Sequence, residues 1–504
     1  MAKIDLTLHR IRRLAALLPA YTRPTCHIAG TNGKGSVSSL LSSILSASQP
    51  PLKVGRFNSP HLISIHDSIV INEKPVAADL HSAIRNEIEL VDRSHDIGAS
   101  GFEILTLTAL VAFERSGVDV VVAEVGMGGR LDATNVIPDD CILVSALTSV
   151  DLDHQAFLGS TVSAIAREKA GVARNGKPFV VGRQKHPEVD EVVQNAVAER
   201  GGHVERVSCV VESVGPKSYL ALPPTSNFRV PAPPRVRIAM PCFSEAVDTT
   251  LPLYGEHQRE NLAIATTIIA TLLSRYPSLG ESTINLRERI TPETVAQGTR
   301  NTTWPGRLSF HQVCIMDQSA PTKPFTVLID GAHNPASATA LAAFISELLI
   351  GPKDAPARHA TTTPISLTFV LALSDSPPKT PVHTLTPLLT LSYALKSPVT
   401  TNVAVVRFSP PDGMPWVKSV APSELRRAVL GILPASDTNV WEAREDEDAG
   451  PGALLRALKW AASQQEEKLV VVTGSLYLVA DFYRLVRDGR LSNSTSSVYA
   501  STMP

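Results

Sequence analysis

Apolar residues in the first 300 positions of the chain form two kinds of pattern that alternate. Short uninterrupted apolar runs at residues 120–123, 142–147 and 179–181 predict buried strands. Apolar residues recur at helical spacing over residues 103–115 and 161–173, which predicts helices before and between these strands. Strands that are apolar throughout and alternate with helices are typical of a parallel sheet covered on both faces.

The same helical spacing predicts further helices at residues 4–18, 37–45 and 261–274. Residues 37–45 follow a glycine-rich segment, which itself follows a short apolar run, so the order is strand, loop and helix. Repeated prolines at residues 208–237 interrupt the alternation. We therefore expect an irregular insertion or an edge-strand region there.

A second alternation of strands and helices begins after residue 303. The strands are expected at residues 325–329, 366–372, 402–408 and 468–473, and the helices at residues 335–349, 423–432 and 452–463. The pattern predicts two α/β domains that meet close to residue 303, with residues 325–329 as the first strand of the second domain. The composition of residues 351–364 and of the tail after residue 492 predicts mobile segments.

Composition narrows the class of protein. A chain of 504 residues is too long for one ordinary core and fits two or three domains. The 47 Lys and Arg residues almost balance the 48 Asp and Glu residues, which disfavours nucleic acid as a partner. No apolar run approaches the roughly 18 residues that a membrane span needs, so we expect no membrane segment.

Five scattered cysteines include no C-x-x-C pair, so neither a disulfide framework nor a zinc site is predicted. They are Cys26, Cys141, Cys209, Cys242 and Cys314. This favours a reducing compartment, and the cytoplasm is the expected location. A basic, amphipathic beginning leaves a mitochondrial location as the alternative.

The segment at residues 27–36, H-I-A-G-T-N-G-K-G-S, has the features of a phosphate-binding loop. Its glycines would let backbone N–H groups approach an anion, and Lys34 adds a positive charge. The general Walker A pattern is not met, because Ile28 stands at a glycine position and Gly35 stands where Ser or Thr is expected. Nucleotide binding is the favoured interpretation, and a simple turn is the alternative.

Polar residues come directly after several predicted strands. Ligands of parallel sheets bind at the carboxyl ends of the strands, so these residues are candidates for a site. Glu124 follows the strand at residues 120–123 and needs a partner, either a divalent cation beside a nucleotide or Arg130. His154, in the run from Asp151 to Gly159, is a candidate metal ligand, base or capping residue.

Lys169 lies near the end of a predicted helix, where a lysine commonly complements the helix dipole. In the second domain, Asp330 and His333 follow a predicted strand and suit ribose hydroxyls and a phosphate or anionic substrate; a plain turn is the alternative. Arg307, in the segment W-P-G-R at the domain boundary, supplies a guanidinium that suits an anion.

Taken together, these motifs resemble the folylpolyglutamate synthase and dihydrofolate synthase family of ATP-dependent amide ligases, which is related to the Mur ligases. They follow one another in the family's order over most of the chain: residues 30–36, 58–62, 102–103, 124–135, 153–154, 158–159, 168–171, 255–258, 261, 304–307 and 330–334. The resemblance implies a P-loop-type parallel-sheet ATPase domain at residues 1–303 and a smaller Rossmann-like α/β domain at residues 304–504.

The resemblance also implies roles for individual residues, with ATP and Mg²⁺ as cofactors. ATP would be bound by Gly30, Thr31, Asn32, Gly33, Lys34, Gly35, Ser36, Asn261, Arg307 and Asp330. The metal would be held by Ser59, Glu124, His154 and, if it is carbamylated, Lys169. The pterin substrate would meet Phe102, Glu103 and Arg130, and His333 would lie beside the incoming glutamate. Catalytic roles would fall to Lys34, Lys169, Arg307 and His333.

One stretch bears on the substrate. Residues 66–72 read H-D-S-I-V-I-N, where folylpolyglutamate synthases usually have an Arg-Glu-Arg-Ile sequence, and this form is similar to fungal dihydrofolate synthases. Residues 407–416 and 474–478 resemble the same branch. The expected reaction joins L-glutamate to 7,8-dihydropteroate through an acyl phosphate, in a monomer. The alternatives are a folylpolyglutamate synthase, a bifunctional enzyme, or a non-catalytic relative that binds folate or nucleotide.

Overall fold

The structure of the chain is a computed structural model. It describes residues 7–215, 230–276, 278–279, 284–316, 321–350, 365–377, 379–391, 399–414, 416–433, 438–444, 449–464 and 468–493. These residues form two compact units. The first comprises Met1–Val214, Arg235–Pro252 and Glu256–Thr303, and the second comprises Gly215–Pro234, Leu253–Gly255 and Trp304–Pro504, in each case as far as they are described.

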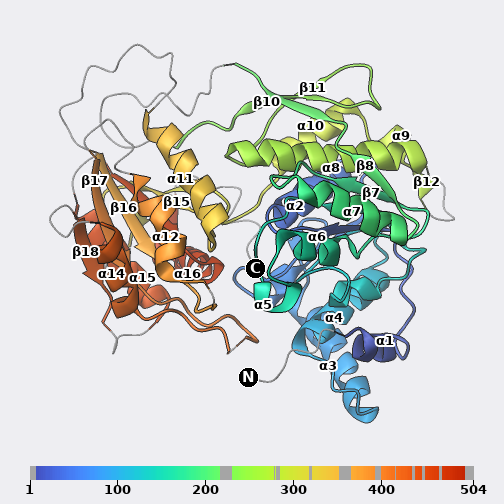
Figure 1. The fold of residues 1–504 in the computed structure, drawn as a ribbon, viewed down its shortest axis with the longest axis horizontal. Coiled ribbons are helices and arrows are strands. Elements are labelled where there is room, and N and C mark those ends of the chain that lie inside the picture. The colour runs from blue at the N-terminus through green and yellow to red at the C-terminus, as the bar shows by residue number, and fades with distance from the viewer. Residues whose placement is uncertain are drawn as a thin grey trace. The chain divides into compact units, whose positions relative to one another are not determined.

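The first unit is built on an eight-stranded sheet (Figure 1). In sheet order its strands are β4 (Lys74–Pro75), β3 (Ile69–Ile71), β2 (Val54–Phe57), β5 (Val120–Glu124), β1 (Thr25–Ala29), β6 (Ile142–Leu147), β7 (Pro178–Val181) and β8 (His203–Arg206). The strands from β2 to β8 in this order are parallel, while β3 and β4 pair antiparallel at one edge. The predicted parallel sheet is therefore confirmed.

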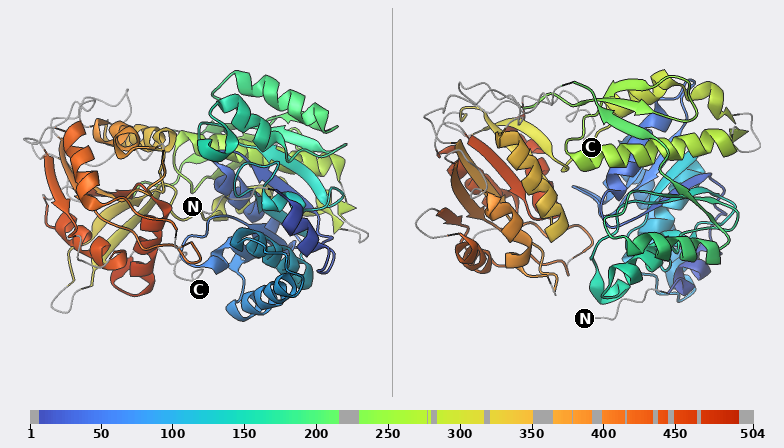
Figure 2. Two further views of the ribbon diagram at one scale, coloured as in Figure 1. Left: turned by 60° about the horizontal axis from the view of Figure 1, so that its bottom comes forward. Right: turned by 45° about the horizontal axis from the view of Figure 1, so that its top comes forward.

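Helices cover both faces of this sheet (Figures 1 and 2). They are α1 (His9–Ala15), α2 (Lys34–Ser46), α3 (Ala78–Ser94), α4 (Gly101–Ser116), α5 (Gln155–Leu158), α6 (Val162–Ala170), α7 (Glu188–Glu199), α8 (Glu256–Arg275), α9 (Leu286–Arg289) and α10 (Pro292–Asn301). The central strands β1, β5 and β6 are buried along their whole length, which explains their uninterrupted apolar sequences. Helix α1 ends at Ala15, three residues before the predicted end.

Where it is described, the proline-rich region at residues 208–237 supplies one edge strand and the start of the central strand of a small antiparallel sheet. Strands β9 (Val210–Ser213), β10 (Arg235–Ala239) and β11 (Val247–Thr250) pair in the order β11, β10, β9. Buried and exposed residues alternate along β10, as expected for a sheet with one solvated face. Residues 216–229 lie outside the described part of the chain. Strands β12 (Ser278–Leu279) and β13 (Ile284–Asn285) form a short hairpin.

The second unit contains a seven-stranded sheet. In sheet order its strands are β18 (Thr438–Glu442), β17 (Val399–Val405), β16 (Ile365–Leu371), β19 (Lys468–Thr473), β15 (Phe325–Ile329), β14 (Ser309–Ile315) and β20 (Leu491–Asn493). Its helices are α11 (Pro335–Ile350), α12 (Pro381–Leu389), α14 (Pro422–Ile432), α15 (Pro451–Ala462) and α16 (Leu476–Arg487). The strands from β18 to β15 are parallel, and β14 and β20 are antiparallel.

The prediction that residues 325–329 form the first strand of this unit is wrong, because β14 precedes them and pairs with them. The sequence of β14 contains His311 and Gln312, which hide its strand pattern. His311 is fully buried, and its Nε2 lies 3.1 Å from the Tyr483 hydroxyl. This hydrogen bond offsets the cost of burying the ring.

Two predicted mobile segments lie mostly outside the described residues. Residues 351–364 lie outside them completely, and so does the tail after residue 493. Among the residues that the structure does describe, no helix combines the length and apolar character needed to cross a membrane.

Candidate nucleotide and metal site

The glycine-rich loop joins β1 to α2 and has a shape that depends on glycine at two positions. Gly30 and Gly33 have positive φ angles of 147° and 92°. A Cβ atom on Gly30 would lie 1.8 Å from Thr148 Oγ1, and one on Gly33 would lie 2.4 Å from Asn261 Oδ1. The loop can therefore bring backbone N–H groups close to an anion, to which the N-terminus of α2 also presents its positive end.

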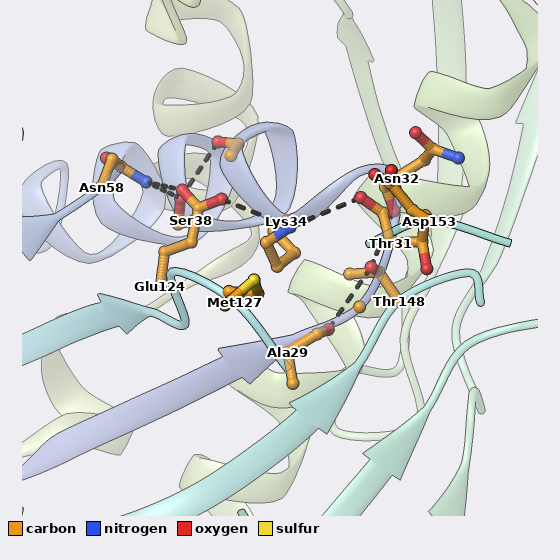
Figure 3. Close-up of polar contacts among 12 residues, drawn as sticks. Ala29, Thr31, Asn32, Lys34, Ser38, Asn58, Glu124, Met127, Thr148 and Asp153 are labelled. Carbon is orange, nitrogen blue, oxygen red and sulfur yellow. Dashed lines mark hydrogen bonds and ion pairs between the residues drawn. The ribbon is translucent and has the colours of Figure 1, made fainter. Parts of the chain in front are cut away.

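Contacts with the segment after β6 hold the loop in place (Figure 3). The Thr31 N–H donates to the Ser149 carbonyl at 2.8 Å, and the Thr148 hydroxyl donates to the Asn32 carbonyl at 2.7 Å. Gly35 and Ser36, also predicted to bind phosphate, lie in the first turn of α2. The strand, loop and helix order of a phosphate-binding loop is thus present in full.

Lys34 and Glu124 face each other beside this loop (Figure 3). The Lys34 Nζ lies 3.9 Å from Glu124 Oε1 and 3.4 Å from the Thr31 carbonyl oxygen. Glu124 is the last residue of β5 and is only 5% exposed. Its second oxygen, Oε2, accepts a hydrogen bond of 2.6 Å from Asn58. A buried carboxylate is therefore held at the end of a central strand, next to the loop lysine.

Arg130 is not the partner of Glu124, so that alternative is wrong. It forms an ion pair with Glu168, in which Nη2 and Oε1 are 2.9 Å apart and Nε also donates to the carboxylate. Arg130 also lines a cavity of about 620 Å³ whose other walls come from α1 and the residues next to its two ends, and from Leu131, Asn135 and Arg200. None of the residues predicted to bind ATP or metal lines this cavity.

Lys169 is buried against the loop rather than placed to complement the dipole of α6. Its Nζ donates to the Gly30 carbonyl at 2.7 Å, and the residue is 3% exposed. Burial lowers the pKa of Lys169 to about 7, and Lys34 adds to this, while Asp153 and Asp132 oppose it. A substantial fraction of this amine is therefore neutral, and nucleophilic, near neutral pH.

The predicted metal ligands differ in their surroundings. Ser59 Oγ is buried without a hydrogen-bond partner among the described residues, which fits a hydroxyl that can coordinate a cation. His154 has a half-exposed side chain and a left-handed backbone with φ of 49°, and its Nε2 lies 3.7 Å from the Asp153 carboxylate. The described residues include no cluster of three or more His, Cys, Asp or Glu side chains suited to a metal.

A hydroxyl and a carboxylate are nevertheless the hard oxygen ligands that Mg²⁺ prefers, and Mg²⁺ commonly takes only one or two protein carboxylates besides nucleotide phosphates and water. Ser59 and Glu124 therefore fit a nucleotide-bound Mg²⁺. An imidazole is a less usual ligand for this ion, so the fit of His154 is weaker.

Two predicted substrate residues already have structural partners. Glu103 is the third residue of α4, and its Oε2 accepts from the Ser100 N–H at 2.7 Å in a capping box. Its carboxylate also lies 3.3 Å from Arg10. Phe102 packs so closely on Gly126 that a Cβ there would lie 2.4 Å from the ring.

Asp132 is a buried carboxylate that was not among the predicted site residues. It accepts from the Met127 N–H at 2.8 Å and from the Thr134 N–H at 3.0 Å, and burial raises its pKa. Asp153, also buried, acts electrostatically on Lys169. Asn58 is the third residue near the site that was not predicted, and it contacts Glu124. Each of these three residues lies within a motif on which the resemblance is based. Their position in a motif is therefore the feature of the sequence that could have identified them.

Asn261 belongs to the first unit and lies on α8. It is buried, and its Nδ2 donates to Gln258 Oε1 at 2.9 Å. Its Oδ1 lies against Gly33, as the close approach to a Cβ at that glycine shows. The structure therefore brings Asn261 to the phosphate-binding loop, although the two are more than 200 residues apart in sequence.

The second unit brings Arg307, Asp330 and His333 together around Gly331. Asp330 follows β15, and its two oxygens accept from the Leu308 and Ala332 N–H groups, each at 2.9 Å. Burial raises the pKa of Asp330, and Arg307 opposes this rise. Arg307 Nη1 would lie 2.7 Å from a Cβ on Gly331.

His333 Nδ1 lies 3.1 Å from the Gly331 carbonyl oxygen. Because a carbonyl can only accept, Nδ1 carries the proton of this hydrogen bond. The other ring nitrogen, Nε2, is then the acceptor in the neutral ring. Asp330 and His333 are therefore fixed by backbone contacts at the end of β15.

These features define an α/β protein of two units in which a phosphate-binding loop, a buried carboxylate and a buried lysine meet at the ends of parallel strands. A family model described as the dihydrofolate synthetase C-terminal domain matches residues 312–485. Saccharomyces cerevisiae dihydrofolate synthetase is 32% identical over 486 residues, which cover 96% of this chain and 98% of the yeast protein. The chain belongs to the dihydrofolate synthetase and folylpolyglutamate synthase family of ATP-dependent ligases, as the motifs predicted.

Further comparisons agree. A probable dihydrofolate synthetase of Schizosaccharomyces pombe is 30% identical and covers 96% of this chain and 99% of its own length. The solved structure of E. coli FolC in complex with DHPP and ADP is 26% identical, has a TM-score of 0.68, and covers 97% of this chain and 95% of that one. The predicted fold class is confirmed by this likeness.

Proposed function

We propose that this protein is a dihydrofolate synthase, which joins L-glutamate to 7,8-dihydropteroate with hydrolysis of ATP to ADP and phosphate. The observation that carries the choice of substrate is the match, over 96% of the chain, to the dihydrofolate synthetase of Saccharomyces cerevisiae. The E. coli relative was solved with DHPP and ADP, which supports the same substrate class. We further propose a monomer in the cytoplasm, with residues 1–303 and 304–504 as its two functional domains.

The chemistry needs charge neutralisation more than a protein nucleophile. The pteroate carboxylate attacks the γ-phosphate and displaces ADP, which gives an acyl phosphate. The glutamate amine then attacks the carbonyl carbon, loses a proton and displaces phosphate. The loop from Gly30 to Ser36 would bind the phosphates of ATP, with Lys34 directed at the transferring group. Arg307 would offset further negative charge, and Asn261 and Asp330 would contact the rest of the nucleotide. His333 would lie beside the phosphate and glutamate.

Ser59 and Glu124 would hold magnesium, with His154 as the third proposed ligand. When bound, this cation would neutralise charge on the nucleotide oxygens and on the transferring phosphoryl group. Solved relatives support this proposal, since one was determined with Mn, AMPPNP and L-glutamate bound. Phe102, Glu103 and Arg130 are the residues proposed to meet the pterin.

Lys169 would act as a carbamate. Its neutral amine would attack carbon dioxide and lose a proton, which converts a cation into a carboxylate-like group able to hold a second magnesium ion. The contact that supports this proposal is the burial of its Nζ against the loop at Gly30. A permanent cation buried there, next to Lys34, would cost considerable free energy.

A folylpolyglutamate synthase or a bifunctional enzyme is the second candidate. A Mycobacterium tuberculosis relative described as dihydrofolate synthase/folylpolyglutamate synthase is 33% identical over 74% of this chain. A non-catalytic binding protein is disfavoured, because simple binding would not require Lys34, Glu124 and Lys169 to meet at one loop.

An ADP-release assay separates these functions. The protein is incubated with ATP, Mg²⁺ and L-glutamate, and with either 7,8-dihydropteroate or tetrahydrofolate as the acceptor. We expect ADP release that depends on both glutamate and dihydropteroate. Activity with tetrahydrofolate alone would favour the folylpolyglutamate synthase, activity with both would favour a bifunctional enzyme, and activity with neither would favour the binding protein.

A further inference from the structure

We propose that Asn58 is a positioning residue that fixes the Glu124 carboxylate for the metal, and that Arg56 and Glu73 hold Asn58 in the orientation this requires. The inference rests on the proposed function in one respect, which is that Glu124 binds the divalent cation of the nucleotide. It assigns a role to a chain of side chains that reaches from the phosphate-binding loop to the hairpin of β3 and β4.

Asn58 lies directly beside Glu124 because their strands are neighbours. Strands β2 and β5 are parallel with Phe57 opposite Ala123, so the next residue along each strand is Asn58 and Glu124 respectively. Asn58 is 4% exposed, and its Nδ2 donates to Glu124 Oε2 at 2.6 Å. The same Nδ2 lies 2.6 Å from the hydroxyl of Ser38 on α2. In Figure 3 the amide nitrogen of Asn58 points toward the Glu124 carboxylate and the Ser38 hydroxyl.

Arg56 determines which way the amide of Asn58 faces. Its Nη1 donates to Asn58 Oδ1 at 2.8 Å, and a guanidinium has no acceptor. The oxygen of the amide must therefore face Arg56, and the NH₂ group must face Glu124, whose ionised carboxylate only accepts. The hydrogen-bond chemistry permits only this orientation.

Arg56 is itself held by Glu73. Arg56 is only 6% exposed, and its Nη2 lies 3.4 Å from Glu73 Oε2. Glu73 also accepts a short hydrogen bond from the hydroxyl of Ser42 on α2. Asn72 and Glu73 form the turn between β3 and β4 with positive φ angles of 50° and 60°. The turn that ends the stretch at residues 66–72 is thereby tied to the carboxylate of Glu124.

The neutrality of Asn58 matters for the charge at the site. Lys34 already lies 3.9 Å from Glu124 Oε1, and a second cation at Oε2 would neutralise the carboxylate further and compete with a metal ion. Asn58 occupies Oε2 through a hydrogen bond and leaves the negative charge in place. It thereby fixes the rotation of the carboxylate, so that Oε1 faces the loop lysine. Partners of this kind that orient a metal ligand typically change metal affinity by about 10 to 100-fold.

The test measures binding of Mn²⁺ with AMPPNP to the full-length protein, by electron paramagnetic resonance of the free ion. We expect Asn58→Ala to raise the dissociation constant of Mn²⁺ about tenfold or more. The matched control is Asn402→Ala in the second unit, since Asn402 is also buried on a strand and its Nδ2 donates to Ser366 Oγ at 3.0 Å. This control should bind within about twofold of the wild type, which is within the usual spread of such measurements.

Wild-type affinity in Asn58→Ala, or equal weakening in Asn58→Ala and Asn402→Ala, would overturn the proposal. If Asn58→Ala does not fold, Glu73→Gln provides the readout, because Glu73 lies on a turn and its side chain is 31% exposed. This variant should weaken Mn²⁺ binding in the same direction but less. Unchanged affinity in Glu73→Gln would equally overturn the proposal. The assay needs no pterin. If the wild type fails to use dihydropteroate but Asn58→Ala still binds Mn²⁺ more weakly than the wild type, the proposed substrate is refuted and the role of Asn58 stands.

Discussion

At the scale of single residues, the loop is surrounded by charges that are balanced locally. Lys34 lies near the carboxylate of Glu124, while Lys169 reaches the carbonyl oxygen of Gly30. The cation on Lys34 lowers the pKa of Lys169, and Asp153 opposes that effect. The net charge of the chain is close to zero, and it gives no indication of this local arrangement of charged and polar groups around the loop.

Replacing Lys34 by alanine removes the positive charge from this loop. We expect kcat to fall by at least about 100-fold, because the charge on the transferring phosphoryl group would lose a pre-positioned cation. The fold should be unchanged by circular dichroism. Lys418→Ala, at an exposed lysine of the second unit, is the control and should keep wild-type activity. A Lys34→Ala protein with half the wild-type kcat would rule out the assigned role of the loop.

His27 offers a test of stability against pH. It is fully buried on β1, its Nε2 lies 2.8 Å from Thr134 Oγ1, and burial lowers its pKa to about 3, with Arg174 adding to the effect. The ring stays neutral in the folded state but takes up a proton in the unfolded state below a pH of about 6.5. The stability it supports is complete above that pH and falls as the pH drops toward about 3.

Between pH 6.5 and pH 4.5, the wild type should therefore lose about 2 to 3 kcal/mol more unfolding free energy than His27→Gln, whose side chain does not titrate. Urea unfolding of both proteins at the two pH values measures this difference. Equal losses in both would show that His27 is not held neutral by burial.

The sequence proposes candidate site residues but does not predict their contacts. Lys169 seemed suited to a helix dipole because its sequence position lies near a helix end. Its bond to the carbonyl of Gly30 joins residues that are 139 positions apart, and it depends on how α6 packs against the loop. The pairing of Arg130 with Glu168 depends on packing in the same way. Local pattern contains no information about either contact.

At the scale of elements, the ends of parallel strands position the site. Glu124 ends β5, Asn58 follows β2, and the glycine loop follows β1, and these three strands are neighbours in the sheet. In the second unit, Asp330 follows β15 in the same way. Ligands of open α/β sheets bind at such ends, so strand order decides which side chains meet.

The conformation of the glycine loop gives a prediction at this scale. Gly33→Ala combines a φ of 92° with a Cβ only 2.4 Å from Asn261 Oδ1, whereas Gly176→Ala has a φ of 68° and open space around its Cβ. Gly176→Ala should therefore lose about 1 to 2 kcal/mol of unfolding free energy from backbone strain alone. Gly33→Ala should lose more and should also fail to bind AMPPNP in a calorimetric titration. Wild-type nucleotide affinity in Gly33→Ala would contradict the described shape of the loop.

The strands that the sequence predicts most accurately are buried strands with few polar residues. Strands β6, β15 and β19 agree with their predicted residues because each is mostly apolar and has a strand on both sides in its sheet. Strand β17 begins and ends three residues earlier than predicted, at Val399–Val405, because polar threonines start it. Strand β14 was not predicted, because the buried residue His311 interrupts its apolar pattern. A hydrophobic pattern does not identify polar residues that are buried through hydrogen bonds to other buried residues.

At the scale of the whole molecule, the proposed catalytic residues are divided between two units. Lys34 and Lys169 belong to the first, and Arg307 and His333 belong to the second. Fold and family follow from the arrangement of motifs along the chain and from its relatives. The stretch at residues 66–72, which bears on the glutamate-accepting substrate, is held within the first unit. Asp67 Oδ2 accepts from the Ile63 N–H at 2.8 Å, and Asn72 Oδ1 accepts from the Val54 N–H at 2.9 Å.

The central claim is that dihydropteroate is activated as an acyl phosphate before glutamate attacks it. It is tested most directly with 7,8-dihydropteroate that carries ¹⁸O in both oxygens of its carboxylate, incubated with the protein, ATP, Mg²⁺ and L-glutamate. Mass spectrometry of the products should find one ¹⁸O atom in each phosphate released and one in the new amide of dihydrofolate. Phosphate without ¹⁸O, released together with dihydrofolate, would contradict the acyl-phosphate route, and a failure to form dihydrofolate would contradict the proposed substrate.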